Sequence, residues 1–134
     1  MLTKKITYTN FNDEEVTETL YFNLSQAELV EMQFSTSGGL REMIERIVES
    51  KDNMQILSTF KNIILKAYGE KSPDGKYLVK ENGELAKRFI DSAAYDAFIM
   101  ELFSNEQAMA DFINGILPKD LKKPEDHKIT EKKG

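Results

Sequence analysis

The sequence predicts an α+β domain that is predominantly helical, with an N-terminal β-hairpin packed on a five- or six-helix assembly. Two patterns carry this prediction. Apolar and polar residues alternate through residues 2–23 with the period of two that is typical of strands. After residue 25 the apolar residues recur three and four positions apart, as they do along one face of a helix.

The predicted hairpin consists of two strands joined by a turn at residues 10–13, where Asn and Asp favour a reversal of the chain. Lys4 and Glu18 fall on the same face as the apolar residues, which predicts fraying or the edge of a sheet. The apolar positions are β-branched, aromatic or leucine, as expected for strands: Leu2, Ile6, Tyr8, Val16, Leu20 and Phe22.

The first helix is predicted to begin after Ser25 and to reach about Phe34. Ser25 and Glu28 have the spacing of a capping box, in which each side chain binds the backbone N–H of the other residue. We expect this helix to bury Leu29, Val30 and Met32. Residues 35–39 then interrupt the helix, because Gly38 and Gly39 tolerate positive φ angles.

Two further helices follow, each with a continuous apolar stripe. The first stripe consists of Leu40, Met43, Ile44, Ile47 and Val48. The second consists of Leu57, Phe60, Ile64 and Tyr68 and is widened by Ile56 and Ile63, which predicts a central helix. We expect Gly69 to end that helix. Residues 72–75 then predict a tight turn into a strand over 76–79, which pairs with residues 70–72 or with the hairpin.

The remaining apolar stripes predict three short helices. The first begins near Asn82-Gly83, and Ser92 ends it and caps the second. Ser104 and Gln107 predict a capping box for the third. Pro118 ends that helix. The apolar stripes contain Leu85, Phe89 and Ile90, then Tyr95, Phe98, Ile99, Leu102 and Phe103, and finally Met109, Phe112, Ile113, Ile116 and Leu117.

Charge divides the chain into a predicted single domain, residues 1–118, and a flexible charged tail, residues 119–134. The first part holds 12 Lys and Arg against 19 Asp and Glu, whereas the second holds 6 against 4. An acidic domain is poorly suited to nucleic acid, whose phosphates attract clustered cations. The tail contains few apolar residues, which favours disorder.

Composition also excludes several classes of protein. The chain has no cysteine, so disulfides and thiolate metal sites are excluded. No apolar run approaches the ~20 residues of a membrane span, and residues 1–5 do not begin a signal peptide. We therefore expect a protein that stays in the compartment where it is made and does not bind a membrane.

The sequence offers no convincing catalytic, cofactor or metal site. His127 lies in the tail without neighbouring ligands, and Glu14 and Glu15 lie beside a turn rather than in a cleft. Ser37-Gly38-Gly39 lacks the spacing of a phosphate-binding loop. Asp74 lacks the further acids of a calcium-binding loop. We expect no enzymatic activity and no cofactor.

The predicted central helix is apolar over more than half its circumference. Two interpretations follow: the hairpin covers the excess apolar surface, or part of it remains as a groove for a partner helix. The residues predicted to bind the partner are Ile56, Phe60, Ile63 and Met100.

Several segments resemble the tail assembly chaperones of long-tailed, siphovirus-type bacteriophages, over about residues 1–121. The Thr-rich hairpin is followed by Tyr21-Phe22-Asn23-Leu24-Ser25-Gln26-Ala27-Glu28-Leu29 and by Gly38-Gly39-Leu40. The most specific segment is Tyr68-Gly69-Glu70-Lys71-Ser72-Pro73-Asp74-Gly75-Lys76, and Phe112-Ile113-Asn114-Gly115-Ile116-Leu117-Pro118 completes the likeness.

The resemblance implies a small acidic helical protein made in the cytoplasm of the infected bacterium and absent from the mature virion. Such proteins bind the tape measure protein, keep it soluble and recruit tail tube subunits. Many also occur in a frameshift-extended form, so this chain would be the short form. The implied partners are the tape measure protein, the tail tube protein, the extended form and further copies of the chain itself.

Two other functions stay open at this point. The chain could be a structural or adaptor protein that remains in the phage particle, or a small binding protein directed at a host target. Detection in purified particles distinguishes the first, and capture of a host protein without phage proteins distinguishes the second.

Overall fold

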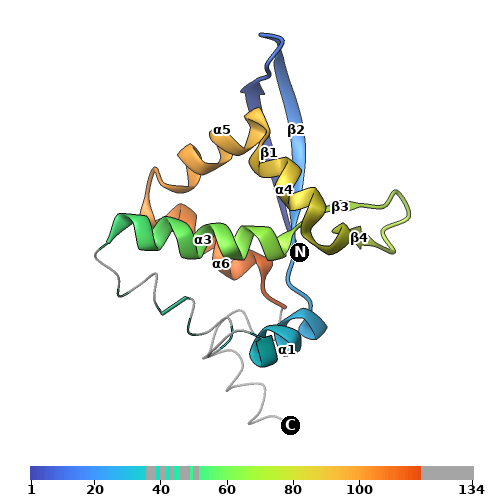
Figure 1. Cartoon of the computed structure of the whole chain (residues 1–134). Helices are drawn as coiled ribbons and strands as arrows, with labels where there is room; N and C mark the ends of the chain where they lie inside the picture. Colours follow the sequence, from blue (N-terminus) through green and yellow to red (C-terminus); the bar gives the residue numbers. More distant parts are fainter. Residues whose placement is uncertain (36–38, 40–41, 43, 46–48, 50–51, 119–134) are drawn as a thin grey trace.

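The computed structural model describes residues 1–35, 39, 42, 44–45, 49 and 52–118. Within these residues, an antiparallel four-stranded sheet in the order β1-β2-β3-β4 packs against α-helices (Figure 1). The predicted α+β class is therefore confirmed.

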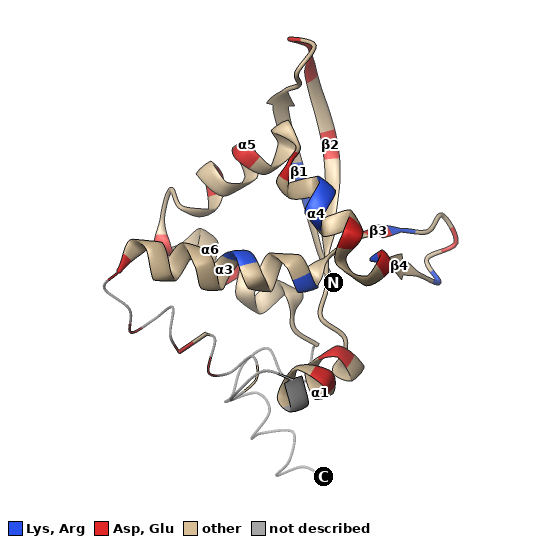
Figure 2. Cartoon of the chain, viewed as in Figure 1, with Lys and Arg blue, Asp and Glu red and all other residues tan. Residues whose placement is uncertain are grey.

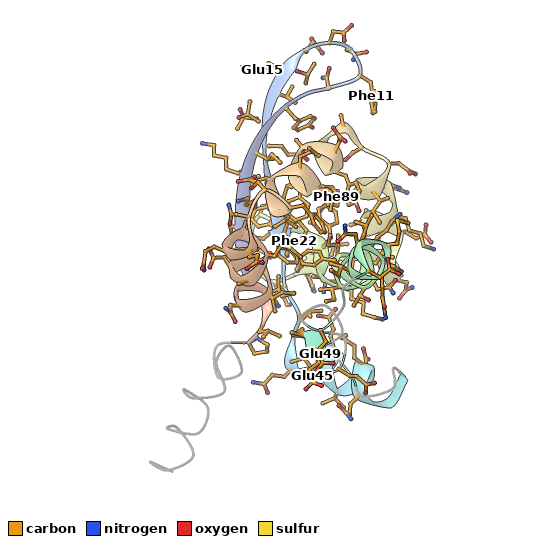
Figure 3. The ribbon with its side chains drawn as sticks, turned by 90° about the vertical axis from the view of Figure 1, so that its left-hand side faces the viewer. Phe11, Glu15, Phe22, Glu45, Glu49 and Phe89 are labelled. Carbon is orange, nitrogen blue, oxygen red and sulfur yellow. The ribbon has the colours of Figure 1, made fainter. Side chains whose placement is uncertain are left out.

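The N-terminal hairpin is formed by β1 (Leu2–Thr9) and β2 (Glu15–Phe22), as predicted. Its turn is fixed by the side chain of Asn10, whose Oδ1 accepts hydrogen bonds from the backbone N–H of Asn12 and of Glu14, at 2.9 and 3.0 Å. The tip of the hairpin extends beyond the helices (Figures 1 and 3).

One face of the hairpin is covered by helices and the other is exposed. Ile6, Leu20 and Phe22 are buried on the inner face. Lys4 also belongs to this face, and its Nζ lies 2.8 Å from Oε1 of Glu101 on the neighbouring helix. This ion pair, rather than fraying, accounts for a lysine at an apolar position of the strand.

The sheet is larger than the predicted hairpin. Helix α3 (Asn53–Ala67) ends directly in β3 (Tyr68–Lys71), which pairs with the end of β2. The strand expected at 76–79 is β4 (Leu78–Val79), and it pairs with β3. Of the two pairings considered for this strand, only the one with the segment before the turn forms, because β3 lies between β4 and the hairpin.

Gly69 follows the end of α3 at the expected position, because Ala67 is the last helical residue and Tyr68 is the cap. It does not adopt the left-handed backbone of a glycine cap, however, and is a buried residue of β3. A Cβ atom at this position would lie 2.8 Å from both Leu78 Cγ and the Val79 carbonyl oxygen. Glycine is therefore needed for close packing of two strands.

The turn at residues 72–75 is held by its own side chains. Asp74 Oδ1 accepts hydrogen bonds from the Ser72 hydroxyl at 2.7 Å and from the Lys76 N–H at 3.0 Å. These bonds stabilise the carboxylate, with the Ser72 bond contributing most, and lower the pKa of Asp74 below its ordinary value.

Helix α1 (Gln26–Ser35) begins with the predicted capping box. The Ser25 N–H donates to Glu28 Oε1 at 2.9 Å, and the Glu28 N–H donates to Ser25 Oγ at 3.1 Å. Met32 is buried as expected, but Val30 is 56% exposed. Val30 was therefore wrongly assigned to the core, because a helix of this length on the surface buries only one face.

The helix predicted from the stripe 40–48 cannot be compared as a whole. Residues 40–41, 43 and 46–48 lie outside the described residues, as do residues 119–134, which include the predicted flexible tail and His127. Ile44 is described and packs against the core.

Three helices complete the described part: α4 (Glu84–Ile90), α5 (Ala93–Leu102) and α6 (Glu106–Ile116). A short left-handed turn, η1 (Glu81–Gly83), precedes α4. Ser92 caps α5 as predicted, accepting a hydrogen bond from the Tyr95 N–H at 3.3 Å.

The predicted capping box of α6 is displaced by one residue. Asn105, not Ser104, caps the helix, and its Oδ1 accepts a hydrogen bond from the Ala108 N–H at 2.7 Å. The Ser104 hydroxyl instead donates to the Glu101 carbonyl oxygen at 2.6 Å. Ser104 therefore helps to close α5, and the next residue takes over the cap.

An aromatic cluster joins the sheet to the helices. The ring of Phe22 on β2 is fully buried; it stacks on Phe98 at 4.9 Å between centroids and meets Phe112 edge-on at 5.2 Å. Tyr68 and Phe89 stack beside it at 4.4 Å. Figure 3 shows Phe22 and Phe89 in the interior. This cluster fixes α4, α5 and α6 relative to the hairpin.

Candidate binding groove

An apolar groove of about 970 Å³ lies between the N-terminal half of α3, the end of α5 and α6. Its volume is near the upper end of the range typical of binding pockets, roughly 300–1,000 Å³. All but three of the residues that line it are apolar, and the exceptions are Asn53, Glu106 and Asn114. The apolar lining consists of Ile44, Met54, Ile56, Leu57, Phe60, Ile99, Phe103, Met109, Ala110 and Ile113.

The groove has a fixed floor and accessible walls. Phe60 on α3 is completely buried, and its ring meets that of Phe103 at 5.7 Å. Met54 is 72% exposed and Phe103 is 39% exposed. Large apolar side chains held at such exposure indicate a contact surface rather than a packed core.

Helix caps hold the two long walls in place. The N–H of Met54 donates to Asp52 Oδ1 at 2.9 Å at the start of α3. Asn105 caps the start of α6. Each cap satisfies a backbone N–H that would otherwise lack an intrahelical partner. The groove is therefore built on helices whose ends are defined.

The groove is also poor in charge. The first eight residues of α3, 53–60, contain no Lys, Arg, Asp or Glu, and the first cation of this helix is Lys61. Figure 2 shows the cations of α3 in its C-terminal half. Glu106 is the one charged residue among those that line the groove. The surface is therefore suited to apolar contacts.

The structure brings together two of the four residues predicted to bind a partner. Ile56 and Phe60 line the groove, although Phe60 forms its buried floor. Ile63 is fully buried in the core and does not line the groove. Met100 is 68% exposed, but it also lies outside the groove. The role of these four residues in binding stays a prediction.

Sequence reasoning missed the walls that α5 and α6 contribute. Phe103, Met109 and Ile113 occur in predicted apolar stripes, where they were assigned to the core. A stripe shows which face of a helix is apolar, but it does not show which residues along that face meet another element. No sequence signal separated these wall residues from their buried neighbours.

A second, polar hollow of about 500 Å³ lies between α1, the end of α3 and the start of α4, and most of the residues that line it are charged or polar. Its central group is Lys80, whose Nζ lies 2.6 Å from Glu28 Oε2, 2.7 Å from the Asn23 carbonyl oxygen and 2.8 Å from the Lys66 carbonyl oxygen. The ammonium group therefore has three acceptors, the number of its donors. This lysine joins α1, the end of β2 and the end of α3.

The described residues offer little for catalysis. They contain no group of three or more His, Cys, Asp and Glu side chains placed to hold a metal ion. Glu14 and Glu15 are exposed at the hairpin turn, as Figure 3 shows for Glu15. Burial raises the pKa of Tyr68 to about 12, with smaller contributions from the charges of Glu18 and Glu70. These groups are distributed over the fold rather than gathered in a cleft.

The fold and the groove define an α+β protein whose accessible apolar surface is suited to contact with another protein. The family model for phage tail assembly chaperones matches residues 1–133, and the chain belongs to this family. Its partners are therefore to be sought among phage tail proteins. Searches of curated proteins and of solved structures found no match. Within the described residues, no helix is long and apolar enough to cross a membrane.

Proposed function

We propose that this chaperone binds the tape measure protein through the groove between α3, α5 and α6, keeps it soluble and helps to recruit tail tube subunits. The observation that carries the proposal is the combination of Met54 and Phe103, which are exposed, with the buried floor at Phe60. An amphipathic helix can place its apolar side in such a groove.

The proposed mechanism is binding without chemistry. A long helical client with exposed apolar surface aggregates through that surface, and occupation of the surface by many chaperone copies lowers the concentration of the free form. The chain carries a formal net charge of −5, which adds electrostatic repulsion between complexes. The proposal requires no cofactor, metal ion or catalytic residue.

The proposal includes the setting in which the chaperone acts. It works in the cytoplasm of the infected bacterium, and it leaves before the virion is complete. Residues 1–118 form the chaperone domain, and residues 119–134 act as a flexible link toward a frameshift-extended form. Mass spectrometry of purified particles checks the release: the chain is expected to be absent. Its stoichiometric presence would favour an adaptor that stays in the particle.

Co-expression with the tape measure protein of the same genome tests the binding. The expected result is a soluble tape measure protein that co-purifies with several copies of the chaperone. The experiment is done with and without the extended form, because that form could be required. A tape measure protein that remains insoluble and unbound in both cases would contradict the proposal.

A matched pair of substitutions tests the groove itself. Phe103→Lys places a charge on the groove wall, whereas Met100→Lys places the same charge on an exposed position of α5 outside the groove. We expect Phe103→Lys to reduce capture of the tape measure protein by about tenfold or more, because a charge buried without a partner is costly. Capture by Met100→Lys is expected to stay near that of the unmodified chain. Equal losses for both variants would exclude the groove.

A further inference from the structure

The outer edge of β1 is a long strand edge to which the described residues assign no partner strand. β1 stands first in the sheet order and pairs with β2 over all eight of its residues, from Leu2↔Phe22 to Thr9↔Glu15, without an interruption in register. A strand edge exposes unpaired N–H and C=O groups that can bind another strand.

The hydrogen bonds of the hairpin identify the groups that face outward. The Asn10 N–H donates to the Glu14 carbonyl oxygen at 2.8 Å, so even-numbered positions of β1 exchange hydrogen bonds with β2. Odd-numbered positions therefore direct their N–H and C=O groups away from β2. These residues are Thr3, Lys5, Thr7 and Thr9, and all four have exposed side chains.

The two edges of the sheet are protected to different degrees. β4, at the far edge, has only two residues and is followed by the left-handed turn of Glu81–Gly83. β1 has neither a proline nor a bulge, and its inward lysine, Lys4, is neutralised by Glu101. Short length, bulges, prolines and charged side chains, lysine above all, are the usual protection of strand edges. Of these, β1 has only its two lysines, of which Lys4 is paired with Glu101 and Lys5 is exposed.

We propose that β1 pairs antiparallel with β1 of a second copy of this chain, about a two-fold axis through Ile6. In this register, Lys5 lies opposite Thr7 of the second copy and Thr3 lies opposite Thr9. The two-fold axis repeats each of these two pairs, so the contact makes about eight new backbone hydrogen bonds, two for each of the four pairs. The two four-stranded sheets become one continuous antiparallel sheet.

Exposed apolar side chains at the two ends of the strand support a second copy as the partner. Met1 is 53% exposed and Phe11, in the hairpin turn, is 83% exposed. The same register brings Phe11 of one copy to the end of the strand where Met1 of the other lies. The turn that carries Phe11 is already fixed by Asn10, so little conformational freedom is lost on contact.

Charge disfavours one of the two neighbouring two-fold registers. A shift by two residues that keeps the two-fold symmetry would place Lys5 directly opposite Lys5 of the second copy, and like charges in that position are destabilising. In the proposed register Lys5 of each copy faces Thr7 of the other. The surface is self-complementary, as a two-fold interface requires.

Sedimentation velocity of the full chain between roughly 1 µM and 1 mM tests the proposal, because this range covers weak to moderately tight association. The expected result is a concentration-dependent dimer with twice the 15.4 kDa mass of one chain. A chain that stays monomeric over the whole range would overturn the proposal.

A substitution that brings two lysines together across the interface tests the register. Thr7→Lys puts a lysine opposite Lys5 of the second copy and is expected to weaken the dimer by roughly three- to tenfold. Thr17→Lys is the matched control, because Thr17 faces Thr7 from β2 and its hydroxyl lies 2.8 Å from that of Thr7. Each substitution therefore removes the same hydroxyl pair and adds the same charge to the same face.

The double variant Lys5→Glu/Thr7→Lys restores opposite charges across the interface and is expected to recover the dimer. Equal dimerisation of Thr7→Lys and Thr17→Lys, or failure of the double variant to recover it, would overturn the proposed contact. Circular dichroism confirms that each variant is folded. The measurement contains no tape measure protein, so its outcome is independent of the proposed binding groove.

Discussion

The two hollows beside α3 differ in what their side chains already bind. In the polar hollow, the ammonium group of Lys80 lies within hydrogen-bonding distance of three acceptors of the same chain. In the apolar groove, Met54 and Phe103 expose much of their surface. The ammonium group of the polar hollow is already hydrogen-bonded within the chain, so this hollow acts as a joint that holds α1, the end of β2 and the end of α3 together. The exposed apolar walls of the groove are instead suited to contact with a partner.

The comparison also explains why the larger hollow is the better candidate for function. Loss of a polar contact in the joint leaves a charge without its partner, so the joint contributes to folding. The groove walls contribute less to folding, because their exposed atoms do not add to the core. Substitutions in the two hollows should therefore separate stability from binding.

Phe60 is the residue at which the groove and the core meet. Phe60→Ala removes a fully buried ring from the groove floor and is expected to lower the free energy of unfolding by about 3–5 kcal/mol. Urea denaturation followed by circular dichroism measures the change. A loss below about 1 kcal/mol would mean that the floor is not packed as described.

Substitution of Lys80 tests whether the polar hollow stabilises the fold. Lys80→Met keeps much of the side-chain length but removes the ammonium group, leaving Glu28 Oε2 and two carbonyl oxygens without this donor. The expected loss in the free energy of unfolding is about 1–3 kcal/mol. Capture of the tape measure protein by the folded variant should be unchanged. A folded variant with normal stability but no capture would reverse the roles assigned to the two hollows.

The raised pKa of Tyr68 predicts that the folded chain loses stability at alkaline pH. Its pKa is raised from the ordinary value of 10.0 to about 12 in the folded chain, chiefly by burial. Between these values the unfolded chain has lost the proton and the folded chain keeps it, so the free energy of unfolding falls as pH rises. The loss attributable to Tyr68 is about 1 kcal/mol near pH 11.

Comparison with Tyr68→Phe isolates this contribution, because the variant cannot ionise at this position. Thermal denaturation between pH 9 and about 11 is the measurement. The variant should show a shallower decline than the unmodified chain. Identical pH profiles for the two proteins would show that the pKa of Tyr68 is not raised in the folded chain.

Local rules predicted most of the fold from the sequence. The alternation in residues 2–23 gave the hairpin, and the spacing of Ser25 and Glu28 gave the first helix cap, because both depend on neighbouring residues. The addition of β3 to β2 was missed. That pairing joins Tyr68 to Phe22, which are distant in the sequence, and no local pattern specifies it.

The groove was predictable only in part, for a related reason. The broad apolar face of α3 indicated excess apolar surface, but the sequence could not show which part the core covers. Ile63 turned inward and is fully buried, whereas Ile56 remained at the groove. The walls from α5 and α6 depend on how helices meet, which is decided by the aromatic packing around Phe22.

Site-specific photo-crosslinking shows directly whether the groove contacts the tape measure protein. A photoreactive amino acid is placed at Phe103 in one variant and at Met100 in another, each is co-expressed with the tape measure protein, and mass spectrometry identifies the products. Crosslinks to the tape measure protein are expected from position 103 and none from position 100. A complex that forms but crosslinks only from position 100, or from neither, would contradict the proposed contact.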